Sequence, residues 1–175
     1  MTKQYLARVT GILYGFNFVL GITAMMWTRE GYTLAGDRMT IAGALEYAVV
    51  VVLLGRLFEN IGPLTSWTVA AVGLAGCTTG IAGALHIFGS TAAALAVFGF
   101  YCIGLGTLVL RSAEMPRAIG VLLMLGGIGW LTYADLPLAR SLQPYNMACG
   151  IIAELIFALW LIFVSLRDRE ARAST

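Results

Sequence analysis

A single carboxylate lies inside an apolar run near the end of the chain. Glu154 is the only charged residue between Met147 and Val164, and the nearest basic residues along the chain are Arg140 and Arg167. An apolar run of this length is typical of a transmembrane helix. A carboxylate at that depth is costly unless it is protonated or partnered, and such groups usually mark functional sites. The run therefore predicts a membrane span with a candidate functional residue inside it.

The composition extends this prediction to the whole chain. Only 11% of the 175 residues are charged, 59% are hydrophobic, and the mean hydropathy is +0.86. A soluble domain has about 25% charged residues. A chain of this length has room for about six spans of roughly 20 residues, which leaves none for a large water-soluble domain. The net charge of +2 is too small to indicate a nucleic-acid partner.

Glycine, proline and polar residues divide the apolar sequence into six candidate spans. We expect these spans at Leu6–Trp27, Met39–Phe58, Leu64–Phe88, Thr91–Leu110, Met115–Ala134 and Pro144–Leu166. The polar segment Thr28–Arg38 and the segment Leu136–Gln143 are expected to be connections. The predicted fold class is therefore all-α: a polytopic membrane protein in which residues 1–175 form a single six-transmembrane-helix bundle.

The basic residues predict the orientation of this bundle, because cytoplasmic ends of spans are enriched in Lys and Arg. Six spans place both termini on one side. That side holds eight of the 11 basic residues: Lys3, Arg8, Arg56, Arg111, Arg117, Arg167, Arg169 and Arg172. The opposite side holds Arg29, Arg38 and Arg140. We therefore expect both termini to be cytoplasmic.

Four polar side chains in four different spans are expected at similar depths in the membrane. At about 1.5 Å per residue from the predicted outer ends, Glu46 lies about 10 Å deep, and Tyr101, Asn17 and Glu154 lie about 14 to 15 Å deep. Such a layer can enclose a small polar chamber in the outer half of the bilayer, with His86 near its mouth.

The two glutamates are the candidate acid–base pair of this chamber. If Glu46 and Glu154 face one apolar cavity, within about 10 Å of each other, they cannot both be ionised at low cost. A proton retained by one carboxyl group can be given to a substrate double bond or epoxide, while the other carboxylate accepts a proton or stabilises a cation. We therefore assign catalytic roles to Glu154, Glu46 and Tyr101.

Asn17, His86, Trp130 and Tyr133 are the candidate ligand-binding residues. Each also has a structural interpretation. Asn17 can form an interhelical hydrogen bond, which contributes about 0.6–2 kcal/mol in membranes. His86 lies near the interface, and Trp130 and Tyr133 are expected at the outer interface as part of an aromatic belt.

We expect neither a metal ion nor a cofactor. The chain has one histidine, and its three cysteines, Cys77, Cys102 and Cys149, form no CxxC pair. This set is too small for a zinc or di-iron site. The cysteines are predicted to be small apolar residues inside spans.

Three segments resemble a known family. They are Ala7–Tyr14 with Val19–Gly21, then Phe98–Cys102 with Gly104–Gly106, Arg111–Ser112 and Met115–Gly120, and finally Ala153–Leu161, which contains Glu154. Together they resemble an uncharacterised, mostly bacterial family of six-helix membrane proteins, domain of unknown function 4386. The resemblance implies a multi-pass fold and a location in the bacterial cytoplasmic (inner) membrane. It implies no established activity.

Three functions stay open at this point. The leading hypothesis is a chamber that binds a small hydrophobic molecule, an isoprenoid or a lipid, and isomerises, cyclises or hydrates it. The second is a non-catalytic accessory or scaffold subunit, in a homo-oligomer or a larger membrane complex. The third is a proton-coupled transporter, which the short chain and the lack of proline-broken helices disfavour.

Overall fold

A computed structural model describes residues 2–87 and 91–163 of the chain, which are helical apart from short connections. Six of the helices are long and apolar enough to cross a membrane. These are α1 (Lys3–Arg29), α2 (Thr33–Phe58), α3 (Pro63–Ala84), α4 (Ala92–Arg111), α5 (Arg117–Leu131) with the 3-10 helix η1 (Thr132–Ala134), and α7 (Tyr145–Phe163). The short helix α6 (Leu136–Ser141) joins η1 to α7. The predicted all-α fold with six spanning helices is confirmed.

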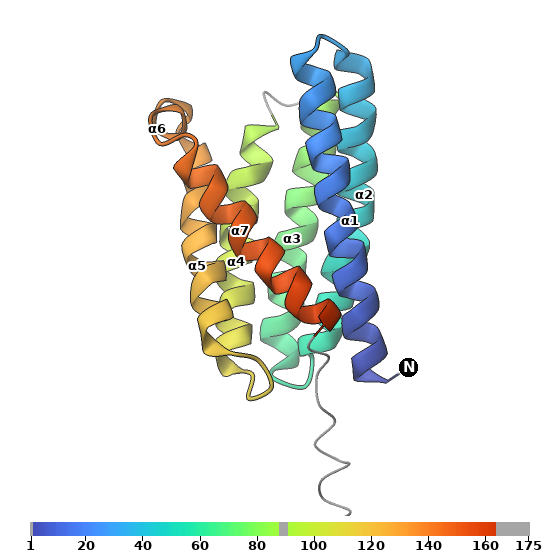
Figure 1. Ribbon diagram of the computed structural model, residues 1–175, viewed down its shortest axis with the longest axis vertical. Coiled ribbons are helices and arrows are strands. Elements are labelled where there is room, and N and C mark those ends of the chain that lie inside the picture. Colours follow the sequence, from blue (N-terminus) through green and yellow to red (C-terminus); the bar gives the residue numbers. More distant parts are fainter. Residues whose placement is uncertain (1, 88–90, 164–175) are drawn as a thin grey trace, which may run out of the picture.

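The six long helices form a ring in chain order. Each packs against the next in the sequence, and α7 closes the ring by packing against both α5 and α1. Figure 1 shows that α7 crosses the bundle obliquely, from the top of α5 to the bottom of α1. The N-terminus and the end of α7 lie at the same end of the ring, which we call the termini end; the other is the α6 end.

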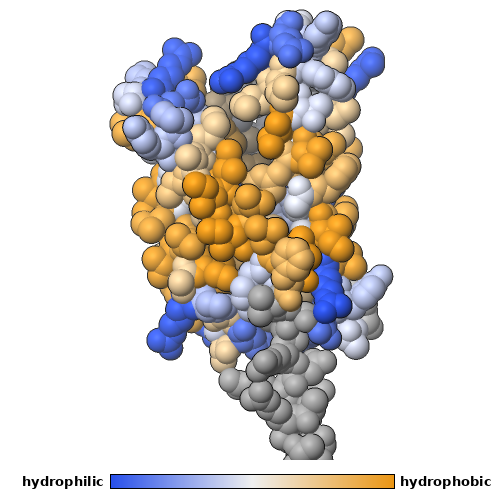
Figure 2. Space-filling model, in the orientation of Figure 1, coloured by the Kyte–Doolittle hydropathy of each residue, from blue (hydrophilic) through white to orange (hydrophobic). Residues whose placement is uncertain are grey.

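Exposed hydrophobic side chains surround the ring between its two ends. In Figure 2 they form a broad apolar surface with hydrophilic residues above and below it. They include Ile12, Val19, Leu45, Phe100 and Ile128, each at least half exposed. A soluble protein rarely exposes an apolar surface of this extent. The pattern fits helices that face lipid.

Two predicted connections contain helix instead. α2 begins at Thr33 rather than Met39, and the segment after η1 forms α6 rather than a loop. The α1–α2 turn is tight because Gly31 adopts a φ of 88°, a conformation that costs glycine little. Asp135 begins α6 by accepting a hydrogen bond from the Leu138 amide. The polar residues of these segments thus extend helices beyond the apolar zone.

The remaining predicted boundaries agree with the observed helices to within a few residues where both are described. The predicted span ends at Phe88 and Leu166 lie outside the described residues, as do Arg167, Arg169 and Arg172.

Glycines hold α4 and α5 in close contact. A Cβ atom on Gly99 would lie 2.8 Å from the Gly127 carbonyl oxygen, and one on Gly127 would lie 2.6 Å from the Gly99 oxygen. Gly106 and Gly120 form a second reciprocal pair, at 2.6 and 2.8 Å. Only a hydrogen atom fits at these positions, so the two backbones pack directly against each other, as small residues allow in membranes.

The oblique path of α7 also depends on close contacts. Near the termini end, a Cβ atom on Gly11 of α1 would lie 2.9 Å from the Ala158 carbonyl oxygen of α7. Near the α6 end, a Cβ atom on Gly129 of α5 would lie 2.6 Å from the Asn146 oxygen of α7. α7 is therefore close to α1 at one end and close to α5 at the other. From the Gly11–Ala158 contact, α1 and α7 diverge toward the α6 end (Figure 1).

Candidate functional site

Glu154 accepts hydrogen bonds from four other helices. Its donors are Tyr14 of α1, Tyr47 of α2, Cys102 of α4 and Trp130 of α5. We call these five residues the Glu154 cluster. A carboxylate has about four acceptor positions on its two oxygens, so this set of donors can satisfy it fully.

The first carboxylate oxygen belongs to a chain of hydroxyl groups. The Tyr14 hydroxyl donates to Glu154 Oε2 at 2.7 Å, and the Tyr47 hydroxyl donates to the Tyr14 oxygen at 2.8 Å. Tyr47 also lies 3.5 Å from Glu154 Oε2, which is a weak contact. Because a hydroxyl group can donate or accept, this chain can reverse direction when Glu154 carries a proton.

The second carboxylate oxygen accepts from a group that can only donate. Trp130 Nε1 lies 2.6 Å from Glu154 Oε1, and Cys102 Sγ lies 3.6 Å from the same atom. The indole packs over Gly150, where a Cβ atom would collide with it. Gly150 and Glu154 are one turn apart on α7, so the glycine makes room for the ring that donates to the glutamate.

The groups that bond to Glu154 are all uncharged. Among the described residues, the ion pairs are Lys3–Glu114 and His86–Asp37, both near the ends of the bundle, and no basic side chain pairs with Glu154. Hydrogen bonds from neutral donors stabilise a carboxylate but leave its charge uncompensated. The cluster can therefore retain a proton or accept a cation.

Glu46 belongs to a smaller polar group. Asn17 Nδ2 donates to Glu46 Oε2 at 2.9 Å and to the Gly43 carbonyl oxygen at 2.9 Å. Glu46 Oε1 has no hydrogen-bond partner among the described residues. Glu46 and Glu154 thus lie in separate hydrogen-bond groups, although Tyr47, next to Glu46 in the chain, belongs to the other group. Their pairing in one cavity stays a prediction.

Tyr101 is buried beside the Glu154 cluster. Its side chain is 1% exposed, and its ring lies 6.1 Å from the Tyr47 ring in an edge-on arrangement. The Tyr101 hydroxyl has no hydrogen-bond partner among the described residues. A buried hydroxyl without a partner is uncommon, so it is a candidate contact for a ligand atom.

Trp130 and Tyr133 lie inside the bundle, and the expectation that they form an interfacial belt is wrong. They are 8% and 7% exposed, and their rings are 5.9 Å apart. Tyr133 also accepts a hydrogen bond from Gln143 Nε2 at 3.3 Å. Gly150 of α7 packs against the Trp130 indole, whereas η1, which carries Tyr133, packs against α4, α5 and α6. The tertiary packing of these helices determines the burial of both rings.

His86 lies apart from the cluster, at the α6 end. Its side chain is 77% exposed, and His86 Nε2 lies 3.2 Å from Asp37 Oδ2 of α2. This contact links the end of α3 to α2. A ligand role for His86 stays a prediction.

Three members of the cluster were not predicted from the sequence. Tyr14 lies one turn from Asn17 on α1, and Tyr47 is the residue after Glu46, so both were available as polar residues near a predicted site. Cys102 was expected to be a small apolar residue, as was Cys149, which is in fact exposed. Helix rotation decides which of two adjacent residues faces a given neighbour, and hydropathy does not report it.

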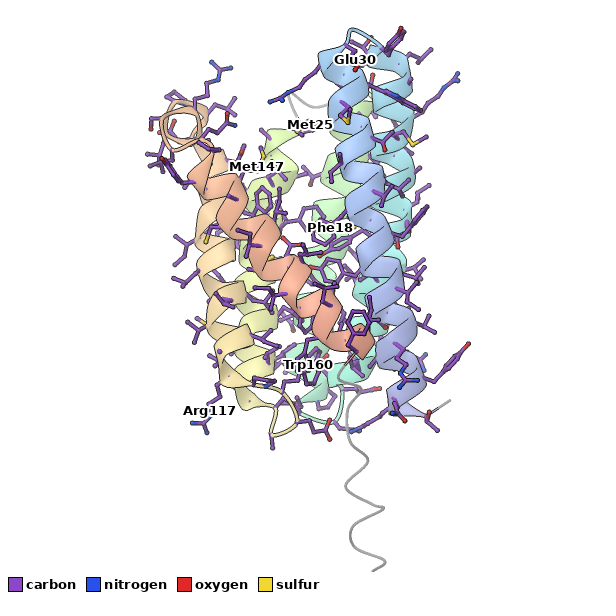
Figure 3. The ribbon with its side chains drawn as sticks, viewed as in Figure 1. Phe18, Met25, Glu30, Arg117, Met147 and Trp160 are labelled. Carbon is purple, nitrogen blue, oxygen red and sulfur yellow. The ribbon has the colours of Figure 1, made fainter. Side chains whose placement is uncertain are left out.

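Glu154 lies where α1 and α7 begin to diverge. Tyr14 and Glu154 are each about one turn beyond the Gly11–Ala158 contact, toward the α6 end. The Glu154 side chain is partly exposed rather than fully buried. Figure 3 shows Phe18 on α1 and Met147 near the start of α7, and both are partly buried residues that pack against the core. Figure 2 shows the surface notched at the α6 end between α6 and the α1–α2 hairpin.

Two cavities lie at the ends of the bundle. One, of about 280 Å³, lies at the termini end between Lys3, Asn60 and Arg111. The other, of about 520 Å³, lies at the α1–α2 turn between Trp27, Leu34 and Arg38. Neither is lined by Glu154 or Glu46.

The second half of the chain matches a known family. Residues 88–165 match the family described as Domain of unknown function (DUF4386). The resemblance predicted from the sequence is confirmed over this stretch. It contains Cys102, Trp130 and Glu154, whereas Tyr14 and Tyr47 lie outside it. No curated protein and no solved structure matches the chain.

Proposed function

We propose that this protein binds a small hydrophobic molecule, an isoprenoid or a lipid, inside the membrane and transfers a proton to and from it. The observation that supports this proposal is the Glu154 cluster, in which a carboxyl group without a basic partner among the described residues ends a chain of hydroxyl groups. Intramembrane ionisable groups of this kind usually have a function.

The proposed reaction uses Glu154 in its protonated form. The carboxylic acid gives its proton to one carbon of a ligand double bond, which produces a carbocation and the Glu154 carboxylate. Loss of a proton from a neighbouring carbon restores the double bond in a new position, or in a ring, and returns the proton to Glu154. Addition of water to the cation instead gives a hydrated product and releases the proton. General acid catalysis of this kind needs the donor within hydrogen-bond reach of the reacting atom.

Tyr101 and Glu46 have supporting roles in this proposal. The Tyr101 hydroxyl, which has no partner among the described residues, can bond to a polar atom of the ligand. Glu46 is the second candidate for proton transfer, because its Oε1 has no partner in the described part of the chain while Asn17 donates to its other oxygen.

Deuterium uptake tests the proposal with a mixture of lipids in place of a single chosen ligand. The protein is reconstituted with the apolar fraction of a bacterial membrane lipid extract in D₂O, and the lipids are examined by mass spectrometry. We expect the wild type to introduce deuterium into at least one component and Glu154→Gln to introduce none. The Gln variant keeps the fold, because its amide oxygen accepts from Trp130 while its NH₂ group donates to the Tyr14 oxygen. Equal deuterium uptake by both proteins would contradict the proposal.

A scaffold function is the second candidate. The observation that favours it is the number of helices that Glu154 connects: α1, α2, α4 and α5 all donate to a residue of α7. In that case the cluster serves only to close the ring, and the apolar exterior binds another copy of the chain or a larger membrane complex. Proton-coupled transport remains third, since the reversible hydroxyl chain also suits a proton relay.

We place the protein in the bacterial cytoplasmic membrane with the termini end in the cytoplasm. The support is the excess of basic residues at that end, five of which are among the described residues: Lys3, Arg8, Arg56, Arg111 and Arg117. Reporter fusions test the orientation. A cytoplasm-active reporter should work at either terminus, and a periplasm-active reporter only in the connections at the α6 end, such as those near Gly31, His86 and Leu142. Periplasmic activity at a terminus would overturn it.

A further inference from the structure

The cavity at the termini end is lined by basic groups and hydrogen-bond donors. It has a volume of about 280 Å³ and lies between the start of α1, the α2–α3 connection and the α4–α5 connection. Its polar side chains are Lys3, Asn60, Arg111, Ser112 and Glu114. All of these except the glutamate can donate a hydrogen bond, and the lysine and the arginine carry a positive charge. Such a set of side chains suits an oxyanion.

Ser112 can act as a buried donor in this cavity. It follows Arg111 at the end of α4 and is 9% exposed. Its hydroxyl oxygen accepts a hydrogen bond from the Glu114 amide at 3.2 Å. A serine hydroxyl that accepts through its oxygen can still donate its hydrogen. The end of α4 therefore supplies both a charged donor and a neutral donor.

Apolar side chains form much of the remaining wall of the cavity. Leu57, Phe58 and Met115 are 5%, 1% and 6% exposed and belong to the core. Apolar walls lower the local dielectric constant, which strengthens the attraction between opposite charges. An anion in this cavity therefore interacts more strongly with Lys3 and Arg111 than it would on an open surface.

Glu114 opposes an anion only in part. Its Oε1 lies 3.8 Å from Lys3 Nζ, which is beyond hydrogen-bond distance, and the two side chains are 28% and 40% exposed. An exposed ion pair of this kind stabilises a protein little, so Lys3 can exchange Glu114 for a more highly charged ligand. With two basic side chains and one acidic side chain, the lining has a net positive charge.

We infer that the termini-end cavity binds a phosphate group, held by Arg111 and Lys3. Ser112 and Asn60 supply further hydrogen bonds to its oxygens. A guanidinium group binds two phosphate oxygens at once, and an ammonium group acts as a point charge. The volume is slightly below the roughly 300–1,000 Å³ of sites for drug-sized ligands, so it suits a small group. A phospholipid head group and a water-soluble phosphate both present this chemistry.

Thermal unfolding of the full chain in a neutral detergent tests the inference with inorganic phosphate as the probe. We expect phosphate to raise the unfolding temperature more than sodium chloride of equal ionic strength does. The apparent affinity for phosphate should fall about tenfold or more in Arg111→Gln, because one charge-assisted pair is lost. Arg117→Gln is the matched control. Arg117 lies at the same end of the bundle (Figure 3) but outside the cavity lining, so its variant should bind phosphate nearly as the wild type does.

Glu114→Gln tests the same site with the opposite sign. It removes the opposing charge and releases Lys3, so the affinity for phosphate should rise about two- to fivefold, as expected for one partly exposed like charge. A gain in affinity does not arise from misfolding, so this variant keeps the test decisive if Arg111→Gln unfolds. A fall in affinity in Glu114→Gln, or equal losses in the two arginine variants, would overturn the inference.

A second probe identifies the source of the phosphate group. In phosphatidylcholine nanodiscs, a rise in unfolding temperature on addition of phosphatidic acid, lost in Arg111→Gln, would assign the site to a lipid head group. An Arg111-dependent response to inorganic phosphate alone would assign it to a water-soluble phosphate. No Arg111-dependent response to either probe would overturn the inference. The proposed reaction would then still stand, because the cavity shares no residue with the Glu154 cluster.

Discussion

Glu154 and Glu46 are both carboxylates inside membrane-spanning helices, but the surrounding helices give them different sets of hydrogen-bond partners. Among the described residues, Glu154 receives hydrogen bonds from four helices, whereas Glu46 receives one, from Asn17 of the neighbouring helix, and has one oxygen without a partner. The Glu154 cluster depends on the closure of the whole ring, while the Glu46–Asn17 pair depends only on the α1–α2 hairpin. A carboxylate inside a membrane-spanning helix therefore connects many helices only when several of them supply its hydrogen-bond donors.

The largest expected difference between the two carboxylates appears when each is replaced by leucine. Glu154→Leu leaves the buried donors of Trp130 and Tyr14 without their acceptor, at about 1–3 kcal/mol for each unsatisfied group. For the two groups together we expect a loss of about 2–6 kcal/mol in the free energy of unfolding. Glu46→Leu should cost less than about 1 kcal/mol, because Asn17 keeps the Gly43 oxygen as an acceptor. Thermal unfolding in detergent measures both. Equal losses of unfolding free energy would show that the hydrogen bonds from several helices to Glu154 stabilise the fold no more than the Asn17 bond to Glu46 does.

A matched pair of glycines tests the same difference through packing. Gly150→Ala places a methyl group against the Trp130 indole and should cost about 1–3 kcal/mol while displacing the donor of Glu154. Gly43→Ala places its methyl group in ordinary contact, 3.6 Å from Leu20 and 3.7 Å from Asn17. It should be neutral or stabilise α2 by up to about 1 kcal/mol, since alanine favours helix more than glycine does. A stable Gly150→Ala protein with normal tryptophan fluorescence would contradict the close α5–α7 contact.

Removal of one donor from each carboxylate should give a smaller effect than removal of the Glu154 carboxylate itself. Trp130→Phe keeps a ring but deletes the N–H group that lies 2.6 Å from Glu154, and we expect a loss of about 1.5–3 kcal/mol, as for a bond to a charged group. Asn17→Leu deletes the one donor to Glu46 among the described residues and should cost about 0.6 kcal/mol, the average for interhelical hydrogen bonds in membranes. The unfolding temperatures of the two variants are the measurement, and Trp130→Phe should unfold at the lower temperature. A lower unfolding temperature for Asn17→Leu would contradict the prediction.

The smallest expected effect concerns the thiol. Cys102 and Cys77 are both buried, at 1% and 2% exposure, but only Cys102 contacts Glu154, at 3.6 Å. A thiol is a weak donor, so Cys102→Ala should be less stable than Cys77→Ala by no more than about 0.5 kcal/mol. A larger gap would mean that the thiol is an essential donor to the carboxylate.

The prediction of the fold from sequence was accurate where hydropathy alone decides the outcome. The six spans and their approximate limits follow from apolar runs. The start of α2 and the helix α6 were missed because polar residues such as Asp37 and Arg140 can lie on helices that extend beyond the apolar zone. Hydropathy indicates whether a segment lies in lipid or in water, and it does not indicate whether a polar segment is helical.

The candidate site was predicted in part. The prediction that Glu154 lies within a candidate membrane span is confirmed. Trp130 was proposed as a ligand residue at the interface and is buried instead. Tyr14 and Tyr47 were missed, although each lies close in sequence to a predicted site residue. Their roles depend on helix rotation, and a rotation of about 100° separates one residue from the next on a helix.

The sequence by itself determined that this chain forms membrane-spanning helices and carries carboxylates within them, because the cost of exposing apolar side chains to water acts on each segment independently. Only the tertiary structure decided which carboxylate became the centre of a cluster. Close contacts at Gly11 and Gly129 set the oblique path of α7, and that path brings Glu154 to Trp130 on one side and Tyr14 on the other. Such contacts join residues far apart in the chain, and no local property of the sequence encodes them.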